Sequence, residues 1–451
     1  MKNEIKNYLF LVGLHVAIGI AIYANLFLSK IYSITIFVLS LYFVIKTKNR
    51  KDEVLYASAY IVGSEVFLRM TDGNPNHEFA KYGVMILLVI GMIYSGISKN
   101  AVPYWIYLLL LVPGVIIGVY ALDYGANIRK AIAFNISGSA CLGVAALYCF
   151  NRVFTIKEIN NLLLVMGLPI ISCATYLYLF TPEIKDVLTG TSSNGALSGG
   201  FGPNQVATAL GLGMFIFFSR LIFLSRSKII FFTNLSLALY ISYRGMLTFS
   251  RGGMITGFFM IIILVLVVYI NSRNASKMKL NYLIGFMSVM MIGVWMYTSR
   301  QTGGYIDKRY ANQDATGRVK ADRFTGRAEI AEEEIEMFKE HPFFGVGVAE
   351  GTEIRTQRRG MKENFASHNE ITRLLAEHGM LGIIALLLLF ITPLFLYYNN
   401  KENIFLLCFV TFWLLTINHA AMRTAAPSFV YALSLLKVRF DDQEEDTIHR
   451  K

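Results

Sequence analysis

Long apolar runs recur along almost the whole of this 451-residue chain. Most cover roughly 18 to 22 residues, enough for a helix to cross the ~30 Å hydrocarbon core of a bilayer with its backbone hydrogen bonds satisfied internally. The composition agrees, because 55% of the residues are hydrophobic and 16% are charged, whereas a soluble domain has about a quarter charged residues. None of the runs alternates as a β-strand does. The sequence therefore predicts an all-α polytopic membrane protein.

Fourteen runs qualify as spans, and because several are short we predict about 12 to 14 transmembrane helices. The runs lie near residues 8–28, 31–45, 54–71, 82–97, 103–122, 131–150, 161–181, 205–224, 229–247, 253–271, 281–298, 380–398, 403–420 and 424–437. The first run is longer than the apolar core of a signal peptide and lacks a small-residue cleavage site. We therefore expect it to be an uncleaved first helix.

Basic residues gather in short clusters between the apolar runs, and the formal net charge is +12. Because the clusters follow no single solvated face, they do not indicate a nucleic-acid partner. They are Lys46, Lys48, Arg50 and Lys51; Arg220, Arg226 and Lys228; Arg273, Lys277 and Lys279; and Lys401. With fourteen alternating helices all of them fall on one side. The positive-inside rule assigns that side, and both chain ends, to the cytoplasm.

One hydrophilic segment, residues 299–379, interrupts the apolar pattern. We expect transmembrane helices 1–11 in residues 1–298, a periplasmic loop at 299–379, C-terminal transmembrane helices in 380–437 and a cytoplasmic tail at 438–451. In this loop thirteen Lys and Arg are balanced by fourteen Asp and Glu, unlike in the clusters on the inner side, which are mainly basic. A loop of this length in a compact helical bundle usually has a function of its own. Helices are predicted inside it from Ala328 to Lys339, which is amphipathic, and from Asn369 to Glu377.

Two groups of polar residues lie at the predicted outer boundary. Ser250-Arg251-Gly252-Gly253 stands between two spans, with Arg244 seven residues before Arg251. An arginine there is costly unless it snorkels to the interface, pairs or faces a hydrated cavity. We interpret Arg251 as functional, because the glycine pair lets backbone or ligand approach its guanidinium. Residues 199–205 form either a glycine-rich turn that ends in an Asn204 cap or a backbone shaped for a sugar or phosphate.

A third and more specific group lies in the loop. It comprises Thr325-Gly326-Arg327, His341-Pro342-Phe343-Phe344-Gly345-Val346-Gly347, Ser367-His368-Asn369-Glu370 and Leu375-Ala376-Glu377-His378-Gly379-Met380-Leu381-Gly382. A lone outward histidine is usually just a solvated side chain. His368, however, precedes a helix that leads into the membrane. There an imidazole can orient a hydroxyl or accept its proton near neutral pH.

Together with Ser250-Arg251-Gly252-Gly253 and Gly202-Pro203-Asn204, these motifs closely resemble the signature of the O-antigen ligase and O-antigen polymerase superfamily. The likeness covers about residues 190 to 390. It implies a membrane glycosyltransferase of the GT-C type that uses no metal and no other cofactor and takes a glycan from undecaprenyl pyrophosphate in the periplasm. The implied acceptor is lipid A-core sugar for ligases, a second lipid-linked glycan for polymerases and a protein hydroxyl for O-oligosaccharyltransferases.

The resemblance also assigns roles. Arg251 and Arg327 correspond to superfamily arginines and are expected to bind the diphosphate, because a guanidinium suits bidentate phosphate contacts. His368 is expected to orient or deprotonate the acceptor hydroxyl, which attacks the anomeric carbon and inverts it. We therefore predict His368, Arg327 and Arg251 as catalytic residues. Predicted substrate-binding residues are Asn204 and Asn369 from the motifs, and Arg129, Arg244 and Arg423, which the topology places outward against the positive-inside trend.

No metal site is predicted, because the loop contains no Asp-x-Asp pair and all four cysteines lie in apolar spans. A transporter or flippase is the competing class, but it would show paired Gly- or Pro-interrupted helices in two related halves, which are not evident. Among glycosyltransferases we favour an O-antigen ligase of the bacterial inner membrane with a lipid A-core acceptor. A polymerase would show a second sizeable outer loop, and residues 182–204 are short for one; polymerase and O-oligosaccharyltransferase remain the alternatives.

Overall fold

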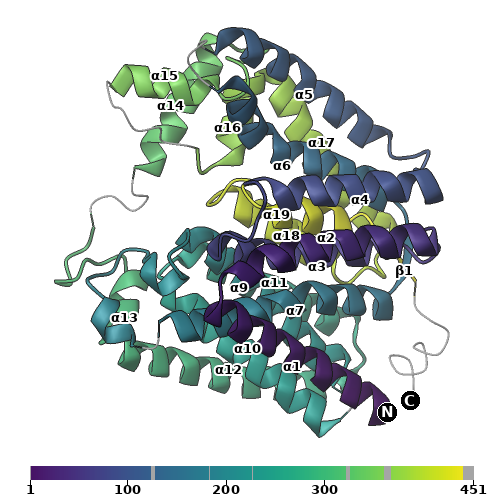
Figure 1. Ribbon diagram of the computed structural model, residues 1–451, viewed down its shortest axis with the longest axis vertical. Coiled ribbons are helices and arrows are strands. Elements are labelled where there is room, and N and C mark those ends of the chain that lie inside the picture. The colour runs from purple at the N-terminus through teal and green to yellow at the C-terminus, as the bar shows by residue number, and fades with distance from the viewer. Residues whose placement is uncertain are drawn as a thin grey trace.

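The computed structural model describes residues 2–122, 127–181, 183–225, 227–320, 326–359 and 367–439, and helices dominate them (Figure 1). Each of the fourteen predicted runs forms a helix, which confirms the all-α polytopic fold. The first eleven are α1 Lys2–Ala24, α2 Phe27–Thr47, α3 Glu53–Met70, α4 Phe79–Ser95, α5 Val102–Ala121, α6 Ile128–Cys149, α7 Ile156–Phe180, α9 Pro203–Phe223, α10 Lys228–Leu247, α11 Arg251–Asn271 and α12 Asn274–Gln301. The last three are α17 Met380–Asn399, α18 Leu406–Ile417 and α19 Ala425–Leu433. Arg226, Thr325 and residues 440–451 of the predicted tail lie outside the described residues.

Not every one of these helices can cross a bilayer alone. Among the described residues nine helices have the length and composition for it, and α4 and α18 are apolar but shorter. α18 has 12 residues and α19 has 9, whereas a span needs roughly 20. The spans predicted at 403–420 and 424–437 were therefore too long. Turns replace their ends, and the two short helices pack against each other and against α11 and α6 inside the bundle.

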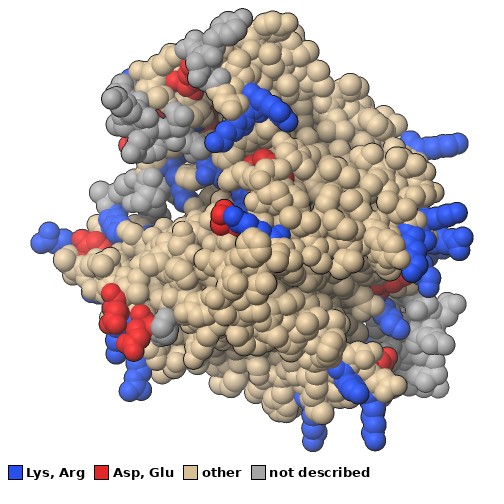
Figure 2. Space-filling model, in the orientation of Figure 1, with Lys and Arg blue, Asp and Glu red and all other residues tan. Residues whose placement is uncertain are grey.

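The loop helices lie at one end of the bundle, and the start of α1 and strand β1 lie at the other (Figure 1). The loop contains α13 Tyr305–Tyr310, α14 Arg327–Glu340, α15 Glu350–Arg359 and α16 Glu370–His378, and α14 and α16 confirm the two helices predicted there. Smaller elements are α8 Ile184–Val187, the 3₁₀ turn η1 Ala196–Ser198, and the parallel pair of β1 Val153–Thr155 and β2 Lys437–Arg439. On the face shown in Figure 2, many Lys and Arg side chains project from the end opposite the loop. The orientation of the chain in the membrane stays a prediction.

The glycines that follow Arg251 serve helix packing. A Cβ on Gly253 would overlap the backbone of Ala207 in α9, and one on Gly257 would overlap the backbone of Gly211. Small residues four positions apart let two membrane helices approach closely, so this stripe fixes α11 against α9. The expectation that the glycine pair leaves room for a ligand beside the guanidinium is wrong for Gly253, because the space is filled by α9.

The segment His341–Gly347 is joined to α16 and to the start of α17 by backbone hydrogen bonds. Gly345 and Gly347 have φ angles of 74° and 100°, a region that favours glycine. The Val346 N–H donates to the carbonyl oxygen of Ala376 in α16 (2.9 Å), and the carbonyl of Pro342 accepts from the N–H of Met380 in α17 (2.7 Å). This motif thus sets the junction between α16 and α17, and with it the position of the residues just before α16.

Candidate functional site

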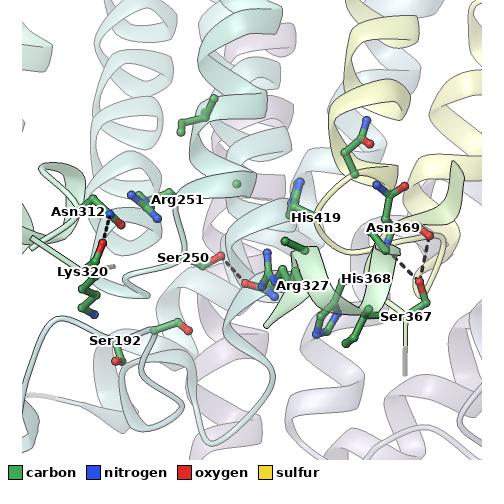
Figure 3. A pocket seen from close by; sticks show the side chains of 18 of the residues that line it. Ser192, Ser250, Arg251, Asn312, Lys320, Arg327, Ser367, His368, Asn369 and His419 are labelled. Atoms are coloured by element: carbon green, nitrogen blue, oxygen red, sulfur yellow. Dashed lines mark hydrogen bonds between the residues drawn. The ribbon is translucent and has the colours of Figure 1, made fainter. Parts of the chain in front are cut away.

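A cavity of about 790 Å³ opens at the loop end of the bundle. Its walls come from the starts of α9, α11 and α14, from α13, from the segment before α16 and from the turn after α18. Figure 3 shows Arg251, Arg327, His368 and His419 around this space, although they come from segments far apart in the chain. The three predicted catalytic residues, Arg251, Arg327 and His368, thus share one cavity.

Three guanidinium groups line the cavity. Nη1 of Arg251 donates to the carbonyl oxygen of Arg309 at 3.4 Å, and Nε of Arg309 donates to the carbonyl oxygen of Phe249 at 2.8 Å. Burial, and then the charges of Arg251 and Arg327, lower the pKa of Arg309. Burial and the charge of Arg251 likewise lower the pKa of Arg327. The three cations therefore repel one another across the cavity.

No carboxylate neutralises this cluster within the described residues. The acidic residue in the cavity wall is Glu334, and its oxygens accept from Nη1 of Arg355 (3.0 Å), Oγ1 of Thr372 (2.6 Å) and Oγ of Ser367 (3.3 Å). Glu334 is thus engaged by its own buried partners. A concave site with unpaired guanidinium groups favours an anionic ligand, above all one with several phosphate oxygens.

Helix dipoles add to this positive potential. Lining residues belong to the N-cap or first turn of four helices: Asn204 in α9, Arg251 in α11, Arg327 in α14 and Asn369 in α16. The first N–H groups of a helix lack partners within it, and its N-terminus carries a partial positive charge. Four such ends at one cavity strengthen the preference for an anion.

His368 lies in the cavity wall as a neutral imidazole. Burial first, and then the positive charges of Arg423 and Arg327, lower the pKa of His368 to about 4. Its Nδ1 is buried and has no hydrogen-bond partner in the described parts of the chain. Nη2 of Arg423 donates to the carbonyl oxygen of Ser367 at 2.6 Å, and the His368 carbonyl accepts from the Ala421 N–H at 3.1 Å, so the backbone around the imidazole is held on both sides.

His419 also lines the cavity, but both of its ring nitrogens are engaged. Nδ1 lies 2.8 Å from the carbonyl oxygen of Leu415, and Nε2 lies 3.2 Å from Oγ1 of Thr208. A Cβ on Gly252 would overlap the His419 ring, so this glycine makes room for the imidazole. Both ring nitrogens of His419 thus hold the ring in place in the cavity wall, whereas Nδ1 of His368 has no hydrogen-bond partner among the described residues.

The predicted substrate-binding residues divide into two sets. Asn204 and Asn369 line the cavity, where Asn204 Oδ1 accepts from Ser250 Oγ (2.8 Å) and Asn369 Oδ1 accepts from the Ile371 N–H (2.9 Å) as the cap of α16. Arg423 does not line the cavity, but its guanidinium donates to the carbonyl oxygen of Ser367, which does.

Arg244 and Arg129 lie away from the cavity. Arg244 is 1% exposed, and its Nη2 donates to the carbonyl oxygen of Leu177 in α7 at 2.6 Å. Arg129 is exposed in the first turn of α6. Sequence reasoning missed Arg309 and Lys320, both in the cavity wall, since neither lies in one of the recognised motifs. Their one sequence signal is position in the loop that carries the other site residues.

Metal ligation was not predicted. Within the described ranges, no group of three or more His, Cys, Asp or Glu side chains is arranged to hold a metal ion. Metal independence itself stays a prediction.

Comparison with known proteins gives one family. Residues 236–387 match the family model described as O-antigen ligase. The matched segment runs from within α10 into α17 and contains Arg251, Arg309, Arg327 and His368. No curated protein matches the chain.

Proposed function

We propose that this chain, whose residues 236–387 match the O-antigen ligase family, is an inverting glycosyltransferase that moves a glycan from undecaprenyl pyrophosphate to an acceptor hydroxyl. The observation that carries the proposal is a cluster of three arginines, Arg251, Arg309 and Arg327, without a neutralising carboxylate in the described residues and beside the neutral His368.

The cluster suits a lipid-linked diphosphate. A sugar on a diphosphate already has a good leaving group, so the protein mainly needs to bind the donor and stabilise the charge that develops as the glycosidic bond breaks. The guanidinium groups of Arg251, Arg309 and Arg327, which all line the cavity, supply that charge. An anion bound among them offsets their mutual repulsion, and this relief contributes to the binding free energy.

His368 acts on the acceptor. Its neutral imidazole orients the acceptor hydroxyl and accepts its proton while the oxygen attacks the anomeric carbon from the face opposite the diphosphate, which inverts the configuration. Burial lowers the pKa of His368 most, followed by the charges of Arg423 and Arg327, and a diphosphate bound beside Arg327 would offset the contribution of that arginine and so raise the pKa. Donor binding thereby makes the imidazole a stronger base when it is needed.

The proposed location is the periplasmic side of the bacterial inner membrane. The basic clusters between the apolar runs support this location. The positive-inside rule assigns them to the cytoplasm, and the alternation of the predicted helices then puts the loop at residues 299–379 on the opposite side. The proposed acceptor is lipid A-core, which makes the chain an O-antigen ligase in lipopolysaccharide biosynthesis. The short outer segment at residues 182–204 supports ligase over polymerase.

Deletion of the gene, read on a lipopolysaccharide gel, tests the acceptor. A ligase predicts the loss of all long chains attached to core. Core that carries a single repeat would instead identify a polymerase, and normal lipopolysaccharide with under-glycosylated surface proteins would identify an O-oligosaccharyltransferase. Complementation with the His368→Ala variant tests the site, because full restoration of the product would contradict the role proposed for the imidazole.

A further inference from the structure

A second hollow, of about 600 Å³, lies between the start of α6 and the loop helix α15. Its polar lining includes Asn127, Lys130 and Asn135 from the start of α6, and Thr352 and Gln357 from α15. None of these residues lines the arginine cavity. The hollow is therefore a separate site, and the diphosphate chemistry described above does not use it.

The chemistry of this lining differs from that of the arginine cavity. It contains amides, hydroxyls, one lysine and one carboxylate, with the aromatic ring of Phe134 among them. Amide side chains both donate and accept hydrogen bonds, as a ligand rich in hydroxyl groups requires. The side-chain amide of Gln357 and the ammonium of Lys130 have no partner within the described ranges. A polar hollow with an apolar ring, hydroxyl groups and the free amide of Gln357 suits a carbohydrate.

The hollow adjoins the backbone that carries His368. The guanidinium of Arg423 lies over the Phe134 ring, 5.9 Å from its centroid. The same guanidinium donates to the carbonyl oxygen of Ser367 at 2.6 Å, one residue before His368. Phe134 and Arg423 thus connect the lining of the hollow to the backbone beside His368.

We propose that this hollow binds the glycan of the acceptor, a step that rests on the proposed glycosyltransferase function. The donor diphosphate occupies the arginine cavity, the acceptor sugars lie between α6 and α15, and one acceptor hydroxyl reaches past Arg423 to His368. The division of charge fits this assignment, because the doubly charged leaving group is held by guanidinium groups and the polyhydroxylated acceptor is held by amides and hydroxyls.

A thiol-labelling experiment tests the assignment. All four native cysteines are buried, so a cysteine introduced at the surface can be labelled selectively. The test variant is Gln357→Cys, and the control is Lys339→Cys, an exposed residue of α14 that lines neither site. Each full-length variant in lipid nanodiscs is treated with polyethylene-glycol maleimide. Two quantities are measured: binding of undecaprenyl pyrophosphate, and transfer of glycan from a lipid-linked donor to purified lipid A-core.

Labelled Gln357→Cys should lose at least about tenfold in transfer while its affinity for undecaprenyl pyrophosphate is unchanged, and labelled Lys339→Cys should keep both. The inference is overturned if labelled Gln357→Cys transfers normally, if its thiol does not react, or if donor binding falls with transfer. If the unlabelled proteins neither bind undecaprenyl pyrophosphate nor transfer glycan, the proposed function fails and this inference fails with it.

A second pair of variants addresses the same hollow without a label. Ala131 lines it from α6, and Ala131→Trp would fill the space that the acceptor needs. Its KM for the acceptor should rise by about tenfold or more while the KM for the donor stays constant, and Lys339→Trp, at an exposed position that lines neither site, should behave like the native protein. Equal acceptor KM values in the two variants would overturn the inference.

Discussion

Replacement of Arg327 by alanine should separate donor binding from stability. Arg327 has no carboxylate partner within the described residues, and burial together with the charge of Arg251 lowers its pKa, so the free protein gains little from its charge. The bound diphosphate, in contrast, loses a charge-assisted contact worth about 2 kcal/mol, which corresponds to roughly 30-fold in Kd. We expect the variant to be as stable as the native protein, or more so, while it binds undecaprenyl pyrophosphate at least about tenfold more weakly.

A neighbouring arginine provides the matched contrast. Nη1 of Arg355 lies 3.0 Å from Oε1 of Glu334, and their side chains are 4% and 1% exposed. Arg355→Ala would leave the Glu334 carboxylate buried without its cation, which typically costs about 3–5 kcal/mol. This variant should therefore unfold at a clearly lower temperature than the native protein, whereas Arg327→Ala should not.

Both quantities can be measured on the same nanodisc preparations, by thermal melting and by titration with undecaprenyl pyrophosphate. The reasoning is refuted if Arg327→Ala melts as early as Arg355→Ala, because Arg327 would then be structural. It is also refuted if Arg327→Ala binds the lipid diphosphate as tightly as the native protein does.

His368→Ala should abolish transfer while it preserves binding of undecaprenyl pyrophosphate, measured on purified protein; retained transfer would argue against a role for the imidazole. Since the pKa of His368 is held at about 4 and the neutral imidazole is the reactive form, kcat/KM should fall on the acid side only as pH approaches that value. Arg423→Gln removes a cation that depresses this pKa, so its acid limb should move to higher pH; an unmoved limb would show that another group titrates. Gly253→Val places a side chain against the backbone of Ala207, so the variant should melt earlier than the native protein, and an unchanged melting temperature would contradict the packing described here. Treatment with EDTA should leave transfer intact, whereas loss of activity that Mg²⁺ restores would refute metal independence.

The membrane fold follows from the sequence because the physical requirement is simple. A run of about 20 apolar residues must bury its backbone polar groups in a helix, so each predicted run is a helix in the structure. The lengths of α18 and α19 do not follow from that rule. These helices lie among other helices, so their buried turns are apolar too, and apolar composition does not distinguish a buried turn from a membrane-spanning one.

The site was predicted in part for a related reason. Arg251 and Arg244 carry the same sequence signal, an arginine near the outer end of an apolar run. Arg251 faces the cavity, but Arg244 turns toward α7 and reaches the carbonyl of Leu177. When a helix is apolar on all sides, the sequence does not show which face a single arginine lies on.

The loop shows the opposite case. His341–Gly347 is the most distinctive motif in the sequence, and in the structure it serves the backbone geometry of the α16–α17 junction. Arg309 follows no recognised pattern, and it joins the site because the short helix α13 folds back onto the start of α11. A distinctive sequence motif can therefore serve either the chemistry of the site or the geometry of the backbone, and the three-dimensional structure is needed to tell which.

The central claim is that a lipid-linked diphosphate binds among Arg251, Arg309 and Arg327 with its sugar toward His368. A structure of the protein with undecaprenyl pyrophosphate in nanodiscs tests it most directly. We predict density for the diphosphate within hydrogen-bonding distance of all three guanidinium groups, at the loop end of the bundle. Diphosphate bound at the end where β1 lies, or outside the arginine cavity, would contradict the account.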